Sequence, residues 1–190
     1  TKPDADKSLF RAVSFTQTMP RVLQGRAPAI AVANLADFTI RAGRSSANLQ
    51  SGFEEIYAQN TSDSLAGMGR ETFEAVNYLK RVNPSQYKPE NGAQYPRNPF
   101  GNSLLQIAQL IKSDVGVEVA FADYGGWDHH VQEMNALPNM LRDFSGSLAA
   151  FWADLGDLRE DVVVVTMSEF GRTAKENGTR GTDHGHANVM

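Results

Sequence analysis

The sequence predicts an α/β fold with a mainly parallel sheet, and the carboxyl-terminal half supplies the evidence. Residues 115–124 alternate apolar and polar side chains, as in a half-buried strand. Residues 162–167 form an apolar run, mostly valine, typical of a strand covered on both faces. Between them, apolar residues at helical spacing along 135–157 predict an amphipathic helix. A strand–helix–strand unit of these lengths is a crossover, so we expect the two strands to be parallel.

Shorter patterns predict the remaining elements. A short apolar run indicates a buried strand at residues 28–33, and apolar residues at helical spacing indicate helices at 46–59, 64–82 and 102–113. Four prolines and an Asn-Gly pair predict a long exposed loop over residues 83–102. The length of the chain suits a single domain over residues 1–190.

The composition narrows the possible functions. The chain carries 18 basic and 22 acidic residues, a formal net charge of −4, so we expect no general electrostatic binding to nucleic acid. It has no cysteine, which excludes disulfides, thiolate metal ligands and thiol nucleophiles. No apolar run approaches the roughly 18 residues of a membrane-spanning helix, so we expect no membrane span. The first residue is not Met, which suggests a processed or trimmed chain.

Three polar loops gather the residues that can carry chemistry. They comprise residues 124–130, 168–172 and 177–186, and the first two follow the strongest predicted strands. Parallel sheets carry active sites at the carboxyl ends of their strands, so we expect the loops to converge. All four histidines lie in the first and third loops, each pair beside an aspartate. Imidazole and carboxylate ligands together suit zinc, manganese or iron better than calcium or magnesium. The alternative is that these residues only form surface turns.

Several of these residues are candidate ligands of a divalent metal. Asp128 and His130 are two apart, which lets both face one ion from a tight turn, and His184 is a candidate third ligand. Asp183 is either a ligand or the partner that orients an imidazole. Glu169 ends a predicted buried strand, where its carboxylate needs a partner, either the metal or a salt bridge to Arg172.

Other polar residues of the loops are candidates for binding a substrate or an anion. Arg172 could hold a planar anion such as phosphate, sulfate or carboxylate. His186 could be a metal ligand, could contact the substrate, or could lie in the outer shell of the metal site. His129, between two candidate ligands, would point away or serve in an outer shell. Asn177 is a further candidate for binding a substrate or an anion. Trp127 is interpreted as a packing residue or pocket wall.

The three loops resemble those of a bacterial family, the domain of unknown function 1501. The motifs are Gly-Gly-Trp-Asp-His-His at 125–130, Ser-Glu-Phe-Gly-Arg at 168–172 and Gly-Thr-Asp-His-Gly at 181–185. Members look like relatives of sulfatases and alkaline phosphatases. The resemblance therefore implies a three-layer α/β/α sandwich and a metal-dependent hydrolase of phosphate or sulfate esters, whose substrate is a small anionic ester. It also implies that Asp128, His130 and His184 bind one metal ion.

The chain departs from the superfamily pattern in ways that favour a second interpretation. The Asp-His pair that normally binds a second metal reads Glu169-Phe170, and residues 1–60 show no metal-binding Asp and nucleophile after an early strand. We expect a fragment that is incomplete at both ends. Many family members resemble exported proteins with twin-arginine signals, which implies a periplasmic or extracellular location. The alternative function is a non-catalytic exported protein that retains a metal- or anion-binding site.

Overall fold

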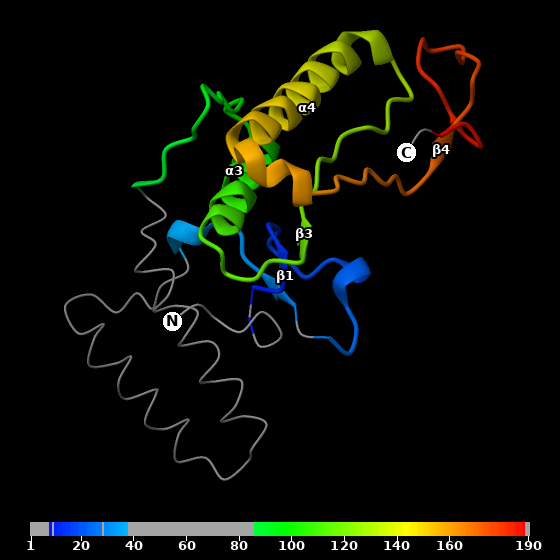
Figure 1. The fold of residues 1–190 in the computed structure, drawn as a ribbon. Helices are drawn as coiled ribbons and strands as arrows, with labels where there is room; N and C mark the ends of the chain where they lie inside the picture. The colour runs from blue at the N-terminus through cyan, green and yellow to red at the C-terminus, as the bar shows by residue number, and fades with distance from the viewer. Residues whose placement is uncertain (1–7, 9, 28, 38–85, 189–190) are drawn as a thin grey trace, which may run out of the picture. The chain divides into compact units, whose positions relative to one another are not determined.

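The computed structural model of the protein describes residues 8, 10–27, 29–37 and 86–188. These residues belong to two units, of which one combines the amino-terminal part of the chain with Leu105–Ala122. The other combines Pro89–Leu104 with the chain from Asp123 onward (Figure 1). The helices predicted at 46–59 and 64–82 lie outside the described residues. No helix in the described part combines the length and apolar character needed to cross a bilayer.

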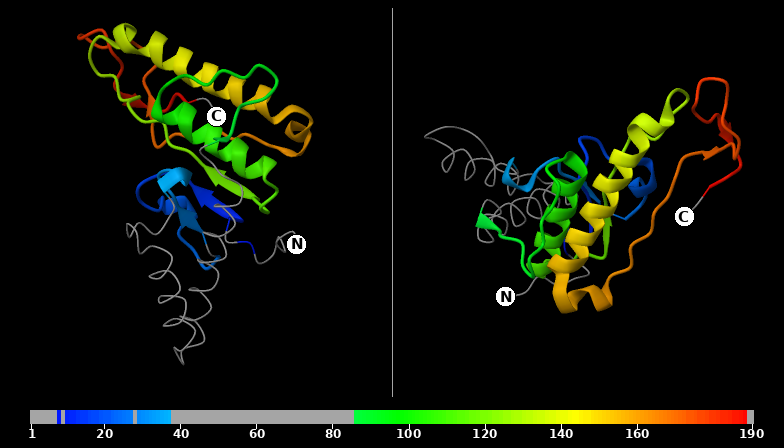
Figure 2. Two further views of the ribbon diagram at one scale, coloured as in Figure 1. Left: turned by 90° about the vertical axis from the view of Figure 1, so that its left-hand side faces the viewer. Right: turned by 90° about the horizontal axis from the view of Figure 1, so that it is seen from above.

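The first unit contains a parallel sheet of three short strands (Figure 2). The strands are β1 (Ala12–Ser14), β2 (Ile30–Ala31) and β3 (Val119–Phe121), in the order β2-β1-β3. Val13 pairs with Ile30 on one side and with Ala120 on the other. Val13 and Ser14 have no exposed surface, because the central strand is covered on both faces. The prediction of a parallel sheet is thus confirmed for these strands.

The sheet confirms two predicted strands and adds a third. β2 lies within the predicted strand at 28–33 and β3 within the one at 115–124, and both are shorter than predicted. The central strand, β1, was not predicted. Its three residues are too few to show an alternating pattern, and it becomes a strand because both neighbours bond to it.

Helix α3 (Pro99–Lys112) begins three residues before the predicted start. In the first unit its Ile107, Ala108 and Leu110 are buried. Gln106 is buried too, and its Oε1 accepts a hydrogen bond of 2.6 Å from the backbone N–H of Leu35. That bond satisfies a polar group that would be costly to bury alone. Two short 3₁₀ helices, η2 (Arg21–Leu23) and η3 (Leu35–Asp37), also belong to the described part of this unit.

The second unit is organised around helix α4 (Glu133–Leu155), which continues into the 3₁₀ helix η6 (Gly156–Asp161). The helix predicted at 135–157 is therefore confirmed, with its bounds moved two residues toward the amino terminus. The beginning of α3 packs on α4 through Phe100, whose ring stacks on Phe144 at 5.4 Å and on Tyr124 at 5.1 Å. These contacts hold the loop that follows β3 against the helices.

A buried carboxylate attaches the proline-rich loop to the end of α4. Asp154 is fully buried and accepts hydrogen bonds from the backbone N–H of Glu90 at 2.8 Å and from the hydroxyl of Tyr95 at 2.9 Å. The described part of this loop, residues 86–98, lacks α-helix and strand, as predicted.

Asp154→Ala should destabilise the protein by about 2 kcal/mol, because it removes the buried acceptor of the hydrogen bonds from the Glu90 N–H and the Tyr95 hydroxyl. Tyr95→Phe, which removes one donor and leaves the carboxylate in place, should cost about 1 kcal/mol. Urea denaturation followed by circular dichroism measures both. Equal stability of Asp154→Ala and the unchanged protein would show that the carboxylate does not anchor the loop.

The prediction of a strand at residues 162–167 is wrong. The segment has no strand pairing, and Val163 and Val165 are 87% and 70% exposed. A strand needs a neighbour to bond with, and no described segment pairs with this one. The parallel pairing predicted between 115–124 and 162–167 is not among the strand pairs of the described residues. An apolar run indicates a tendency to be buried but does not identify the partner that buries it.

After this segment, two short strands form an antiparallel pair. These are β4 (Gly171–Arg172) and β5 (His184–Gly185), with Arg172 opposite His184. The described residues thus form a mixed α/β structure with one three-stranded parallel sheet and two α-helices. They do not show the complete three-layer sandwich that the resemblance implies.

Candidate metal centre

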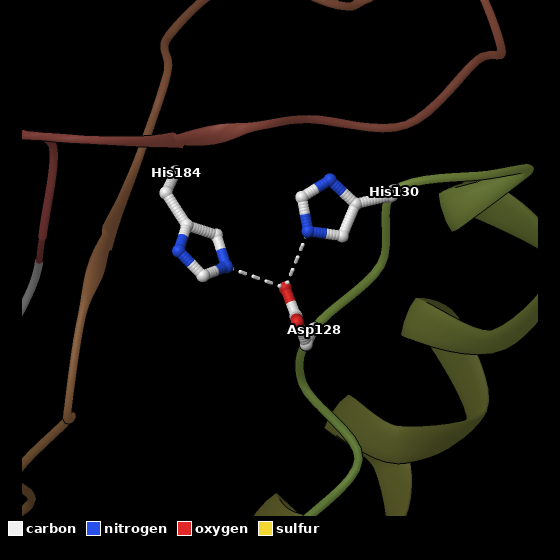
Figure 3. Close-up of side chains that lie close together, drawn as sticks. All are labelled: Asp128, His130 and His184. Atoms are coloured by element: carbon white, nitrogen blue, oxygen red, sulfur yellow. Dashed lines mark hydrogen bonds and ion pairs between the residues drawn. The ribbon is translucent and has the colours of Figure 1, made fainter.

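Three side chains of the second unit meet around one carboxylate oxygen (Figure 3). Asp128 Oδ1 lies 3.0 Å from His130 Nε2 and 2.9 Å from His184 Nε2. One possible ligand atom from each residue can be chosen so that all lie within 4.8 Å of one another. The three side chains are between 44% and 53% exposed, so an ion can reach them from solvent. This group could hold a metal ion.

Hydrogen bonds between two loops bring these residues together. Asp128 and His130 lie in the loop before α4, whereas His184 begins β5. The 177–183 loop docks on residues 129–133. Its backbone–backbone bonds to that segment are Gln132 N–H to Thr179 O at 3.0 Å, Glu133 N–H to Arg180 O at 2.9 Å and Thr182 N–H to His129 O at 3.1 Å. Two of these bonds also satisfy backbone N–H groups at the start of α4, which have no partner within the helix. The docking therefore places β5 beside the Asp128 loop.

Glycine makes this close docking possible. A Cβ on Gly181 would lie 2.3 Å from the backbone carbonyl carbon of His130, far inside van der Waals contact. Gly171 and Gly185 face each other across the β4–β5 pair, where a Cβ on Gly171 would lie 2.5 Å from the carbonyl oxygen of Gly185. These three glycines thus serve the approach of backbone to backbone.

Arg172 ties the three loops together through its guanidinium group. Its Nη1 donates to Asp128 Oδ1 at 2.5 Å, and its Nε donates to Thr182 Oγ1 at 2.8 Å. Its Nη2 donates to the backbone oxygen of His129 at 2.6 Å and to that of Thr182. The alternative prediction of a salt bridge between Arg172 and Glu169 is therefore wrong. Four protein acceptors use most of the guanidinium donors, which leaves few for an anion.

The surroundings of Asp128 favour its ionised form. The hydrogen bond with His184, the bond from Arg172 and the nearby imidazoles lower the pKa of the Asp128 carboxyl, and this outweighs the opposing effect of desolvation. The side chain is therefore available as an anionic ligand at neutral pH.

Asp183 and Asn177 lie behind His130. Asp183 Oδ1 is 3.0 Å from His130 Nδ1, the ring nitrogen that does not face Asp128. Asn177 Nδ2 donates to the same Asp183 oxygen at 2.9 Å and to the backbone oxygen of His130 at 2.9 Å. The bonds from Asn177 and His130 lower the pKa of the Asp183 carboxyl. Both residues contact the metal group only from its outer side.

The other predicted site residues are placed differently. Glu169 is exposed, and the structure gives it neither a hydrogen bond nor an ion pair among the described residues. His186 is exposed as well and is not part of the metal group. His129 contributes through its backbone, which accepts the bonds from Thr182 and Arg172. Its imidazole is not part of the metal group.

The loop motifs contain two aromatic residues, Trp127 and Phe170, and both make packing contacts. Phe170 stacks on the His184 ring with centroids 4.3 Å apart and planes 11° from parallel. Trp127 Nε1 donates to the backbone oxygen of Tyr124 at 2.6 Å, and its ring packs edge-on against Tyr124 and Phe144. The packing role predicted for Trp127 is confirmed. The stacking of Phe170 on His184 was not predicted. One indication of it in the sequence is the position of Phe170 in the same motif as Arg172.

The comparisons with known proteins place the chain in a family. Residues 3–190 match the family described as "Protein of unknown function (DUF1501)". The chain belongs to the DUF1501 family. Searches of curated proteins and of solved structures give no significant match. Membership in DUF1501 confirms the family indicated by the loop motifs, and the description of DUF1501 assigns no reaction to it.

Proposed function

We propose that this protein is a metal-dependent hydrolase of phosphate or sulfate esters, related to the alkaline phosphatase superfamily. The observation that carries the proposal is the convergence of Asp128, His130 and His184, whose candidate ligand atoms lie within 4.8 Å of one another. Two imidazoles and one carboxylate form a ligand set that suits zinc, manganese or iron. The three side chains are half-exposed, so an ion that they held would be accessible to a substrate from solvent.

The residues of the site have separate tasks in such a reaction. A bound divalent ion supplies Lewis-acid chemistry, which stabilises the negative charge that develops on an ester oxygen. Asp128, His130 and His184 hold the ion, and Arg172 keeps Asp128 in place through its bond to Oδ1. The resemblance of the loops to those of a family whose members look like sulfatases supports the ester class and the three-layer sandwich. The resemblance of many members to exported proteins with twin-arginine signals supports export.

A second candidate function is a non-catalytic exported protein that binds a metal or an anion. The hydroxyl groups beside the metal group favour it, because they already have partners. Thr179 Oγ1 donates to the backbone oxygen of His130 at 2.7 Å, and Thr182 Oγ1 donates to Glu133 at 2.9 Å. Ser168 Oγ donates to the backbone oxygen of Phe170 at 2.8 Å. Thr179 and Ser168 donate to backbone oxygens, which are not bases, and the Thr182 hydroxyl is held between Glu133 and the guanidinium of Arg172. None of the three hydroxyls is therefore poised as a nucleophile.

Metal analysis followed by an ester screen separates the two functions. The full chain, loaded with Zn²⁺, Mn²⁺ or Fe²⁺, should retain about one ion per chain after desalting. It should then hydrolyse p-nitrophenyl phosphate or p-nitrophenyl sulfate, and chelation should abolish the activity. Bound metal without turnover of any ester would favour the binding protein. The absence of bound metal would contradict both functions in their metal-dependent form.

A further inference from the structure

The His130 ring lies between two carboxylates. Its Nε2 is 3.0 Å from Asp128 Oδ1, and its Nδ1 is 3.0 Å from Asp183 Oδ1. A neutral imidazole has one N–H, so it can donate to only one of them. The other nitrogen then directs a lone pair at a carboxylate oxygen, which is unfavourable unless a cation lies between them. The position of the ring proton therefore decides which nitrogen can bind a metal ion.

The network around Asn177 determines the direction of its amide group. Asn177 Oδ1 accepts hydrogen bonds from the backbone N–H groups of Thr179 at 2.9 Å and Gly181 at 3.0 Å. Because an amide NH₂ group cannot accept these bonds, the oxygen must face the loop and Nδ2 must face Asp183 and the His130 carbonyl. Asp183 is thereby held in place as an ionised acceptor directed at His130 Nδ1.

On the other side of the ring, Asp128 Oδ1 already has two further nitrogen partners. Arg172 Nη1 donates to it at 2.5 Å, and His184 Nε2 lies 2.9 Å away. A hydrogen bond donated by His130 therefore stabilises Asp128 less than it stabilises Asp183. The balance favours a hydrogen bond from His130 Nδ1 to Asp183.

We propose that Asp183 and Asn177 are positioning residues that hold His130 in the tautomer protonated at Nδ1 and so keep Nε2 free to bind a divalent metal ion. The inference rests on the metal site proposed above. It assigns Asp183 to the outer side of that site instead of to direct metal ligation, and it gives Asn177 a positioning role instead of anion binding. Metal-binding histidines commonly donate their second ring N–H to a carboxylate in this way.

The imidazole of His184 is oriented by a different kind of contact. In the described part of the chain, its only polar partner is Asp128, and its ring is oriented by the stacked Phe170. The two imidazoles of the group are therefore supported differently, one by a hydrogen-bonded carboxylate and the other by an aromatic face. Loss of Asp183 should affect the His130 tautomer and leave that of His184 unchanged.

The tautomer can be observed directly in the metal-free protein. Long-range ¹H–¹⁵N correlation spectra at about pH 8, where most histidines are neutral, distinguish the protonated nitrogen from the other. We expect His130 to carry its proton on Nδ1 and Asp183→Ala to yield a mixture of tautomers. Asp183→Asn keeps an oxygen acceptor and should restore most of the Nδ1 form. Glu176→Ala removes one negative charge from an exposed position of the same loop and should change nothing.

Zinc affinity provides the second measurement. Asp183→Ala should raise the Kd for Zn²⁺ by about 10- to 100-fold, with partial recovery in Asp183→Asn. A wild-type His130 protonated on Nε2, or a Kd for Asp183→Ala within about twofold of the wild type, would overturn the proposal. If the wild type bound no Zn²⁺, the metal site itself would fail. The spectra of the metal-free protein would still show whether Asp183 sets the tautomer, so the two failures can be told apart.

Discussion

Asp128→Ala should nearly abolish metal binding, raising the Kd for Zn²⁺ by on the order of 1,000-fold. Asp128 supplies the only carboxylate of the metal group, and its Oδ1 lies within 3.0 Å of both imidazoles. Without it, two half-exposed histidines remain, and neither neutralises the charge of the ion. Competition with a chromophoric chelator measures the affinity. Adding His184→Ala to this variant should remove the remaining binding.

Two controls separate ligand loss from other effects of Asp128→Ala. Asp157→Ala removes the same charge from an exposed position in η6 and should leave the Kd unchanged. Circular dichroism should show that the variant remains folded, since Arg172 retains its bonds to Thr182 and to the backbone oxygen of His129. A Kd equal to that of the wild type would place any bound metal elsewhere in the chain.

The charges around the metal group connect metal binding to the choice of ligand. The site contains two carboxylates, Asp128 and Asp183, and one guanidinium, that of Arg172, so these groups together carry a net negative charge when the imidazoles are neutral. A divalent ion would reverse the sign of this charge. A phosphate or sulfate ester would be repelled from the metal-free site and attracted to the metal-bound one. Anion binding that depends on metal is therefore consistent with both proposed functions.

Local patterns in the sequence were sufficient to predict the metal group and the long helices. Asp128 and His130 are two residues apart, and His184 lies in a second Asp-His pair, so residue type and spacing alone pointed to these three. Helix α4 follows from apolar periodicity because its hydrogen bonds are internal. Such features can be predicted because the residues that determine them lie close together in the sequence.

Features that depend on a distant partner could not be read in the same way. The β4–β5 pair is too short to show a pattern, and it forms because Gly171 and Gly185 allow two backbones to approach. The apolar run at 162–167 predicted a strand, yet its pairing depends on a neighbour that no local pattern specifies. One alternative paired Arg172 with Glu169, three residues before it, whereas its guanidinium bonds to Asp128, 44 residues before it.

Gly181→Ala should weaken zinc binding by on the order of 100-fold, although it changes no ligand. The added Cβ would lie 2.3 Å from the His130 carbonyl carbon and 2.7 Å from the carbonyl oxygen of His129. Both contacts are with backbone, so no side chain can move aside to make room. The 177–183 loop must shift away from the Asp128 loop, which moves His184 relative to Asp128 and His130. Isothermal titration with Zn²⁺ measures the loss.

Gly178→Ala is the matched control, because it adds the same methyl group to the same loop where no atom lies within 4 Å. The backbone at neither glycine has a positive φ, so the two variants differ in the space around the new methyl group and not in backbone strain. If both variants bound Zn²⁺ as the wild type does, close docking of the loops would not be required for the site. A loss confined to Gly181→Ala would show that the metal group depends on the contact between two backbones as much as on its three ligands.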